Sequence, residues 1–577
     1  MAFEREELPP HRWRCEVASQ VFRALLLRVA VVTITTLVEG AGCGINGPTY
    51  TDIDYLVISD AGALLISGHS PYERTTFRYT PVLALIASLN QMVHPVAAKL
   101  FFCCCDGAVG LMMALAMKRS PESLRVVCWG WLFNPVVVNL STRGSADSLP
   151  CALVVGMLCA ALSAGKRLAA AQPLVDRGAV KSEVTKKRGR SVERRVHASS
   201  KSRSQSRSKH GNTSLEQSSS PTIPMILGAT AHGLAVHVKL YPVIYFPPVL
   251  AFLYRCSTKK RRKNNDGIDN CSFPVVEWDA LIPVVKWVLI AALAFCVATL
   301  SVMVLSSTRQ EFLERAILYH FGRADHRHNY SIWWYAFYLL YDDEGDGAHA
   351  PTTWSEPWAC RKFLGIAALV PVASFLLLAV RGTIFCETTN EASIMVISLS
   401  FCLFVSTAVF VHAGKVLTAQ YFLWYLALLP LAWPAIFTVS KISPKALQSF
   451  AQQPEEISSE EGDKTQRRTR KSGKTGTTTS ASRSEREMQS KESDHRSNVK
   501  NPLSAPTHHR YYHLVRLLFL WITSMILWLG VAYMLEFQGW DVFSELWIAS
   551  LAFFATSSLV LREIVDLGNA AASFTIL

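Results

Sequence analysis

The sequence predicts an all-α polytopic membrane protein, and its composition and charge distribution are the two observations that predict it. Half of the 577 residues are apolar, only 18% are charged, and the mean hydropathy is +0.21. Soluble domains carry about 25% charged residues, and a single soluble core seldom grows beyond roughly 250–300 residues. This composition argues against a single soluble domain.

The positive charge is concentrated in three polar segments. Residues 166–210 carry a net charge of +11, and residues 255–263 and 441–516 carry +6 each. Because the whole chain has a formal net charge of +14, the remaining body carries −9. Segments rich in Ser, Thr, Lys and Arg have little apolar surface to bury, so they are predicted to be disordered loops. Positively charged loops favour the cytosolic side of a membrane.

The Arg-Ser run at 201–210 has a second interpretation, because clustered cations also attract nucleic-acid phosphates. No aromatic residues interleave with it, and it lies between apolar segments. We interpret it as a solvated cytosolic loop and expect no nucleic-acid partner.

About 12 membrane-spanning helices (10–13) are predicted, since a span needs ~20 apolar residues. Clear candidates and shorter ones are distinguished by length. The clear candidates are 20–38, 97–117, 283–305, 360–380, 393–412, 416–438, 514–535 and 543–561, and the shorter ones are 80–94, 149–165, 222–236 and 240–254.

The positive-inside rule orients these spans. Arginines that we interpret as flanking the first span place the N-terminus in the cytosol, together with the three basic loops. This topology works only if 124–140, interrupted by Asn134-Pro135, is re-entrant or broken, because proline removes a helix hydrogen bond. The aromatic segment 331–341 must then lie at the interface, and both termini are cytosolic. The flanking arginines are Arg12, Arg14, Arg23 and Arg28.

This topology divides the chain into five parts. Two membrane modules and a C-terminal helix pair are separated by two basic cytosolic loops that are predicted to be disordered. The parts are 1–165 with a first lumenal loop at 40–80, the loop 166–221, 222–440 with a lumenal loop at 306–359, the loop 441–512, and the helix pair 513–577.

Five polar clusters fall together on the lumenal or external side. Ionisable residues at membrane level are costly, which makes them functional candidates. Their convergence on one face suggests a single site. The clusters are 50–81, 141–148, 237–242, 318–331 and 412–425.

Asp52 and Asp54 form a D-x-D in the first of these clusters, where the carboxylates could bind a metal or serve as a general base. Fixed cations nearby would suit a phosphate ligand or leaving group. Two classes fit: a membrane transferase that uses a lipid-phosphate donor, or a transporter with charges along its pathway. The charges lie at one face, and no inverted repeat is evident, which favours the transferase. The cations are Arg74, Arg78, Arg143, His237, Lys239, Arg327, His328 and Lys415.

A set of ordered motifs resembles the PIG-M family, the GPI mannosyltransferase I enzymes, along the whole chain outside the basic loops. The first motif contains the D-x-D at Asp52 and Asp54. The motifs are 50–55, 60–61, 68–72, 78–81, 134–135, 141–148, 237–242, 319–321, 325–331, 415–425 and 535–539.

The resemblance implies a GT-C type glycosyltransferase fold in the endoplasmic reticulum membrane, with lumenal active-site loops. It implies transfer of an α1,4-linked mannose from dolichyl-phosphate mannose to a glucosaminyl-phosphatidylinositol lipid, with inversion of the donor linkage. A PIG-X-like stabilising subunit is a possible partner. A GT-C mannosyltransferase with another lipid-linked acceptor is the nearest alternative.

Inversion requires a general base on the acceptor hydroxyl. Our hypothesis is that Asp52 is this base and that Asp54 orients it or the acceptor, although the sequence does not separate the two roles. A lipid monophosphate needs no bridging cation, so no obligatory metal is expected. The candidates to hold the donor phosphate are Lys239, Lys415, Arg143, Arg327 and His237, and the acceptor-binding or supporting candidates are Asp60, Arg74, Arg78, Asp147, His320, His328, Asn329 and Gln420.

Overall fold

The computed structural model describes residues 7–41, 49–171, 220–258, 277–305, 309–322, 329–339, 392–437 and 507–576. Within these ranges every regular element is helical, which agrees with the predicted all-α class. The predicted span 360–380 and most of the loops 166–221 and 441–512 lie outside the described residues. Helix α8 continues to Ala171, and α23 begins at Thr507, so one end of each predicted loop is helical.

Six described helices are long and apolar enough to cross a membrane. A seventh span results if one bent pair of helices is counted, so the described residues do not establish the predicted number of about 12. Five of the six coincide with clear candidates, and the sixth, α8, was expected only as a shorter segment. The six are α1 (Pro10–Gly40), α5 (Ala97–Ala116), α8 (Ser148–Ala171), α12 (Trp278–Leu305), α23 (Thr507–Gln538) and α24 (Phe543–Ile576).

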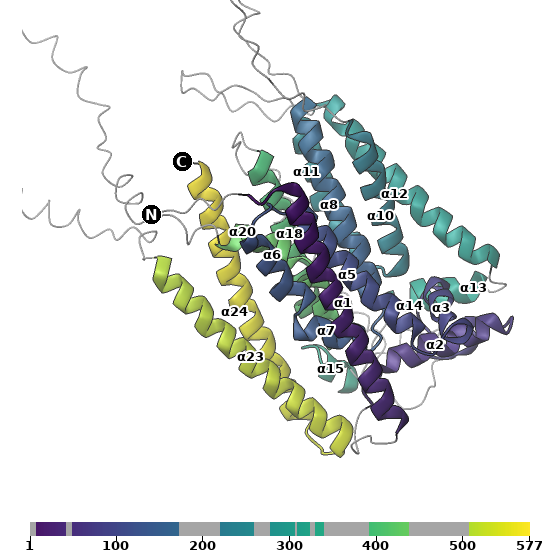
Figure 1. Cartoon of the computed structure of the whole chain (residues 1–577). Coiled ribbons are helices and arrows are strands. Elements are labelled where there is room, and N and C mark those ends of the chain that lie inside the picture. The colour runs from purple at the N-terminus through teal and green to yellow at the C-terminus, as the bar shows by residue number, and fades with distance from the viewer. Residues whose placement is uncertain are drawn as a thin grey trace, which may run out of the picture.

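Further helices complete the body of the protein (Figure 1). α10 packs between α8 and α12, where glycines allow close approach. A Cβ at Gly233 would lie 2.1 Å from the carbonyl oxygen of Ala291. Small residues at such crossings let membrane helices pack through backbone contact. These helices are α10 (Thr222–Val238), α11 (Phe246–Ser257), α18 (Ala392–Ala413), α19 (Phe422–Leu426) and α20 (Leu429–Phe437).

The predicted span 416–438 is not one continuous helix. A non-helical segment and the 3₁₀ turn η5 (Ala419–Tyr421) precede α19, and α20 follows after a further break. Similarly, 240–254 is divided into the 3₁₀ turn η3 (Tyr241–Tyr245) and α11, and 80–94 into α3 (Pro81–Ala87) and α4 (Leu89–Met92). Polar residues close to these breaks turn out to line the candidate site.

The segment 124–140 is broken, as predicted. α6 (Pro121–Val127) and the π-helical turn η2 (Cys128–Leu132) meet α7 (Pro135–Thr142) at an angle of 44°. Asn134 caps α7 by accepting a hydrogen bond from the backbone N–H of Val136 at 3.0 Å. Pro135 occupies the first helical position, where its missing N–H costs nothing.

The aromatic segment expected at the interface contains only the short helix α15 (Trp334–Leu339) in its described part. It packs on the antiparallel pair α23 and α24, which lie side by side in Figure 1. Trp528 donates from Nε1 to the carbonyl of Tyr330, and Trp547 donates to that of Ile332, both at 3.1 Å. The C-terminal pair thus anchors the polar segment around Tyr330.

The polar ends of several helices meet at one end of the bundle. The C-terminal ends of α1, α7 and α10 lie there with the N-terminal ends of α5 and α8 and the turn η5, as hydrogen bonds among residues 39, 51, 99, 143, 147, 239 and 420 show. α2 (Ile53–Ile66) and α13 (Arg309–Phe312) pack at the same end, where Ser70 donates to Glu311 at 2.9 Å (Figure 1). The helix ends that flank 172–219 and 259–276 point to the opposite end.

Arg28 corrects the sequence-based topology argument. It does not flank the first span but lies in the middle of α1 and is fully buried. Its guanidinium pairs with Asp106 of α5 at 3.2 Å and donates to the carbonyl of Leu132 at 2.8 Å and to the hydroxyl of Ser141 at 3.3 Å. A charge in an apolar interior needs such partners, so Arg28 joins α1 and α5 to the broken segment.

Removing one partner of this ion pair should destabilise the protein strongly. Arg28→Met leaves Asp106 uncompensated, which costs about 3–5 kcal/mol for a buried pair. We expect a large fall in the melting temperature of the detergent-solubilised protein, partly restored in the double variant Arg28→Met/Asp106→Leu. Arg23→Met, which removes an exposed arginine of the same helix, is the control. An unchanged melting temperature for Arg28→Met would contradict this role.

Candidate functional site

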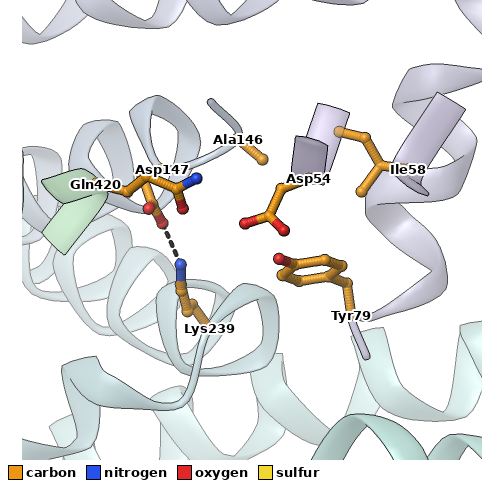
Figure 2. A pocket seen from close by; sticks show the side chains of 7 residues that line it. All are labelled: Asp54, Ile58, Tyr79, Ala146, Asp147, Lys239 and Gln420. Carbon is orange, nitrogen blue, oxygen red and sulfur yellow. Dashed lines mark hydrogen bonds and ion pairs between the residues drawn. The ribbon is translucent and has the colours of Figure 1, made fainter. Parts of the chain in front are cut away.

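A cavity at the polar end of the bundle brings together residues from four of the predicted clusters. It encloses about 240 Å³ of space, part of it open to solvent. Figure 2 shows its polar side chains converging from separate segments of the chain. The lining residues are Asp54, Ile58, Tyr79, Ala146, Asp147, Lys239 and Gln420.

Asp52 is the N-cap of α2 and lies beside the cavity with only 5% of its surface exposed. One carboxylate oxygen accepts the backbone N–H of Asp54 at 3.0 Å, which satisfies a free donor of the first turn. The Nε2 atom of Gln420 donates to both oxygens, at 3.0 and 2.9 Å. Burial raises the pKa of Asp52, and the charge of Asp54 adds to this, against the lowering influence of Arg143 and Gln420.

Asp54 stands in the first turn of α2 and faces the cavity, with the Tyr79 hydroxyl beside its carboxylate (Figure 2). Burial raises the pKa of Tyr79 well above its ordinary value, and the charge of Asp54 and a hydrogen bond to it act in the same direction. Tyr79 therefore stays protonated and can donate to Asp54. The two aspartates of the D-x-D thus have different surroundings, since Asp52 is enclosed and Asp54 borders the cavity.

Lys239 and Asp147 form an ion pair on the opposite wall of the cavity. Lys239 caps the C-terminal end of α10, and Asp147 directly precedes α8, so both charges are favoured by the helix dipoles. The ammonium also lies 4.9 Å from the ring centroid of Trp424 and 5.2 Å from that of Tyr421. The second oxygen of Asp147 is buried and has no hydrogen-bond partner among the described residues.

The turn after α7 holds the D-x-D loop in place. Gly144 has φ +96°, and a Cβ there would lie 2.4 Å from the ring of Tyr55, so this turn requires glycine. The carbonyl of Arg143 accepts the backbone N–H of Asp52 at 3.0 Å, and its Nε donates to the carbonyl of Tyr50 at 2.9 Å. Arg143 thus supports the loop and carries its charge beside Asp52.

Several predicted residues have other contacts. The two ring nitrogens of His237 lie 3.1 Å from the hydroxyls of Thr80 and Thr299, so it joins α10 to α12 and to the loop before α3. It is not among the residues that line the cavity. Asp60 and Arg74 form an exposed ion pair at 3.0 Å. Exposed pairs of this kind are common on protein surfaces and contribute little to stability, so the contact gives no sign of a functional role.

A second group supports the neighbouring loops. His320 donates to the carbonyl of Arg78 at 3.3 Å, while the Arg78 guanidinium lies 4.7 Å from the Tyr319 ring centroid. Asn329 donates to the carbonyl of Lys415 at 2.9 Å and accepts the N–H of Leu417 at 2.8 Å, so it shapes the segment before Gln420. Arg327 and His328 lie outside the described residues.

Sequence reasoning missed three side chains behind the D-x-D loop and one on the cavity wall. Glu39, Thr51 and Lys99 form a hydrogen-bonded cluster next to Asp52, and Tyr79 faces Asp54. Glu39 and Lys99 are charges at the ends of apolar helices, a pattern that snorkelling to the interface explains equally well. Only packing shows that they meet.

No group of three or more His, Cys, Asp or Glu side chains among the described residues is arranged to hold a metal ion. The D-x-D itself supplies two carboxylates at the cavity. The expectation of a metal-independent reaction therefore stays a prediction.

A family model described as Mannosyltransferase (PIG-M) matches residues 214–449 and 502–565, just over half of the chain. The chain belongs to the PIG-M mannosyltransferase family. It is therefore an enzyme, a mannosyltransferase, and the long apolar helices show that it is a membrane protein. The resemblance stated from the sequence motifs is confirmed.

Relatives of this family align along most of the chain. The zebrafish (Danio rerio) protein named GPI alpha-1,4-mannosyltransferase I, catalytic subunit, is 28% identical over 554 residues, 95% of each chain. The GPI mannosyltransferase 1 of Dictyostelium discoideum is 29% identical over 396 residues, 67% of this chain and 71% of the relative. That of Saccharomyces cerevisiae is 29% identical over 386 residues, 66% and 72% of the respective chains.

Loss of the Gln420 amide should change the pH dependence of mannosyl transfer. Its N–H groups favour the charged form of Asp52, so Gln420→Met should raise the pKa of Asp52 further. If the reaction needs the carboxylate, activity on the acidic side should then be lost at a higher pH than in the wild type. The measurement is kcat against pH. Gln20→Met, which removes an exposed amide on α1, should leave the profile unchanged.

Proposed function

We propose that this chain transfers the first, α1,4-linked mannose from dolichyl-phosphate mannose to a glucosaminyl-phosphatidylinositol lipid in GPI-anchor biosynthesis. The observation that carries the proposal is the cavity, in which a carboxylate and a cation face each other, within a family of mannosyltransferases. The names of the zebrafish, Dictyostelium and yeast relatives support the acceptor class, and that of the zebrafish protein supports the linkage.

The geometry favours Asp54 over Asp52 as the general base, the reverse of the hypothesis drawn from sequence. Asp54 borders the cavity, whereas both oxygens of Asp52 accept hydrogen bonds from Gln420. A base must come within hydrogen-bond reach of the hydroxyl that it deprotonates, at about 2.6–3.2 Å. Asp54 would take the proton of the acceptor hydroxyl as that oxygen attacks the anomeric carbon. Asp52 would fix the position of α2 and keep the local charge negative.

Lys239 is the cation best placed for the donor phosphate. As the glycosidic bond breaks, negative charge grows on the dolichyl phosphate, and a fixed ammonium in a water-poor site stabilises it. Because this phosphate leaves readily, no general acid is needed. The free oxygen of Asp147 can accept a hydrogen bond from a sugar hydroxyl, while its other oxygen holds Lys239. Arg143 and Lys415 stay candidates for a supporting role.

The arrangement of helix ends supports a lumenal site in the endoplasmic reticulum. The cavity lies at one end of the bundle, and the helix ends next to the basic segments 172–219 and 259–276 point to the other. α1 begins, and α24 ends, at this second end, so both termini would be cytosolic under the positive-inside rule. The zebrafish relative is named as a catalytic subunit, which implies a further subunit and favours a PIG-X-like partner here too.

The test of the proposed function uses microsomes from cells that lack this activity. Expression of the chain should restore the first mannosylated GPI intermediate from labelled dolichyl-phosphate mannose. Label transferred only to another lipid-linked acceptor would assign a different GT-C reaction. Movement of a lipid-linked sugar in proteoliposomes without a new glycosidic bond would support the transporter alternative and overturn the proposal.

Replacing Asp54 should remove most of the chemical step. A positioned base contributes roughly 10²–10⁴-fold, so Asp54→Asn should lower kcat by that factor while the protein still folds. Asp52→Asn should also lower kcat. Asp60→Asn, at an exposed carboxylate of the same helix, should retain activity. Full activity of Asp54→Asn would show that another group acts as the base.

Mannosyl transfer should not require a divalent cation, because a monophosphate donor offers no diphosphate to bridge. We expect EDTA-treated microsomes to keep their initial rate. A loss of activity that Mn²⁺ restores would contradict this expectation and assign the D-x-D carboxylates to a metal.

A further inference from the structure

Three side chains that do not line the cavity form a cluster next to the D-x-D loop. The backbone N–H of Thr51 donates to one oxygen of Glu39 at 2.9 Å, and its hydroxyl donates to the other at 2.7 Å. Lys99 donates from Nζ to the same hydroxyl at 2.7 Å. Thr51 is thus held between a carboxylate from the end of α1 and an ammonium from the start of α5.

Burial makes these contacts strong. Lys99 is only 3% exposed and Thr51 8%. The ammonium also lies 5.2 Å from the ring centroid of Tyr55, whose hydroxyl donates to Asn90 at 2.9 Å. Hydrogen bonds to charged groups in a low-dielectric site contribute more than neutral ones, and leaving either charge unpaired there is costly. The cluster therefore has a well-defined geometry.

The three residues 50–52 are fixed from different directions. The hydroxyl of Tyr50 lies 2.6 Å from that of Thr142 at the end of α7. Thr51 is held by Glu39 and Lys99, and the N–H of Asp52 by the carbonyl of Arg143. Since Asp54 follows within one helical turn, the placement of Thr51 sets where both carboxylates lie.

We propose that Glu39 and Lys99 are positioning residues that act through Thr51 on the D-x-D carboxylates. Neither is among the residues that line the cavity. The role rests on the proposed function in so far as Asp52 and Asp54 carry the reaction. A shift of even 1 Å in a catalytic group can cost ~10²-fold in rate, so a cluster that fixes the loop acts on kcat.

Lys99 also contributes its charge to the site. The charged groups around Asp52 are Asp54 on α2, Arg143 at the end of α7 and Lys99 on α5, with Glu39 of α1 reached through Thr51. A nearby cation favours the ionised form of a carboxylate. Removing the Lys99 charge should therefore make Asp52 protonate at higher pH.

The first test compares two substitutions of Thr51. Thr51→Val keeps the shape of the side chain but loses the hydroxyl. It should lower kcat about 10- to 100-fold, with little change in the KM for dolichyl-phosphate mannose. This loss of rate corresponds to roughly 1–3 kcal/mol, the cost of leaving a buried charged group without its hydrogen-bond partner. Thr51→Ser restores the hydroxyl and should retain most of the rate. Thr33→Val is the matched control, because that hydroxyl bonds only within α1, to the carbonyl of Val29.

The second test measures the pH profile of kcat for Lys99→Met. The acidic limb should move to higher pH, which a purely structural defect would not cause. Equal rates for Thr51→Val and Thr51→Ser, or an unshifted profile for Lys99→Met, would overturn the proposal. If Asp52→Asn and Asp54→Asn instead kept full activity, the proposed base would fail, and this outcome is separate from the Thr51 comparison.

Discussion

Burial of charge at one end of an apolar helix bundle is the constraint on which the rest of this structure depends. Charged groups in such surroundings must find partners, and here the partners come from distant parts of the chain. Asp52 accepts hydrogen bonds from Gln420, and Asp147 pairs with Lys239. The hydroxyl of Thr51 connects Glu39 to Lys99. Each pair connects two or more helix ends, so the polar contacts that stabilise the bundle also build its cavity.

The same principle operates in the middle of the bundle, where the Arg28–Asp106 pair joins α1 and α5 to the broken segment. The end of that segment carries Arg143 and Gly144, which hold the D-x-D loop. A continuous set of packed elements therefore runs from a buried ion pair to the D-x-D loop. This connection explains why a broken helix, which leaves backbone groups free, is useful at this place in a membrane enzyme.

The two walls of the cavity carry different groups. One wall carries Asp54 of the D-x-D with Tyr79, and the other carries Lys239 and Asp147 beside stacked aromatic rings. Under the proposed function, a carboxylate and a cation on opposite sides of a small space suit a direct displacement at a sugar carbon, with acceptor and leaving group on opposite faces. Lys239 stays charged in this partly buried position because it forms an ion pair with the carboxylate of Asp147.

The sequence by itself determined the all-helical membrane class, the broken segment around Pro135, the D-x-D and the family, because hydropathy, proline and long ordered motifs are local features. Tertiary structure decided which side chains meet. It gave Asp52 and Asp54 different surroundings, placed Arg28 in the buried middle of the first helix and not at its flank, and directed His237 toward Thr80 and Thr299. It also revealed Tyr79, Glu39 and Lys99. These results depend on contacts between residues far apart in the chain. Local sequence patterns do not determine which distant residues come into contact.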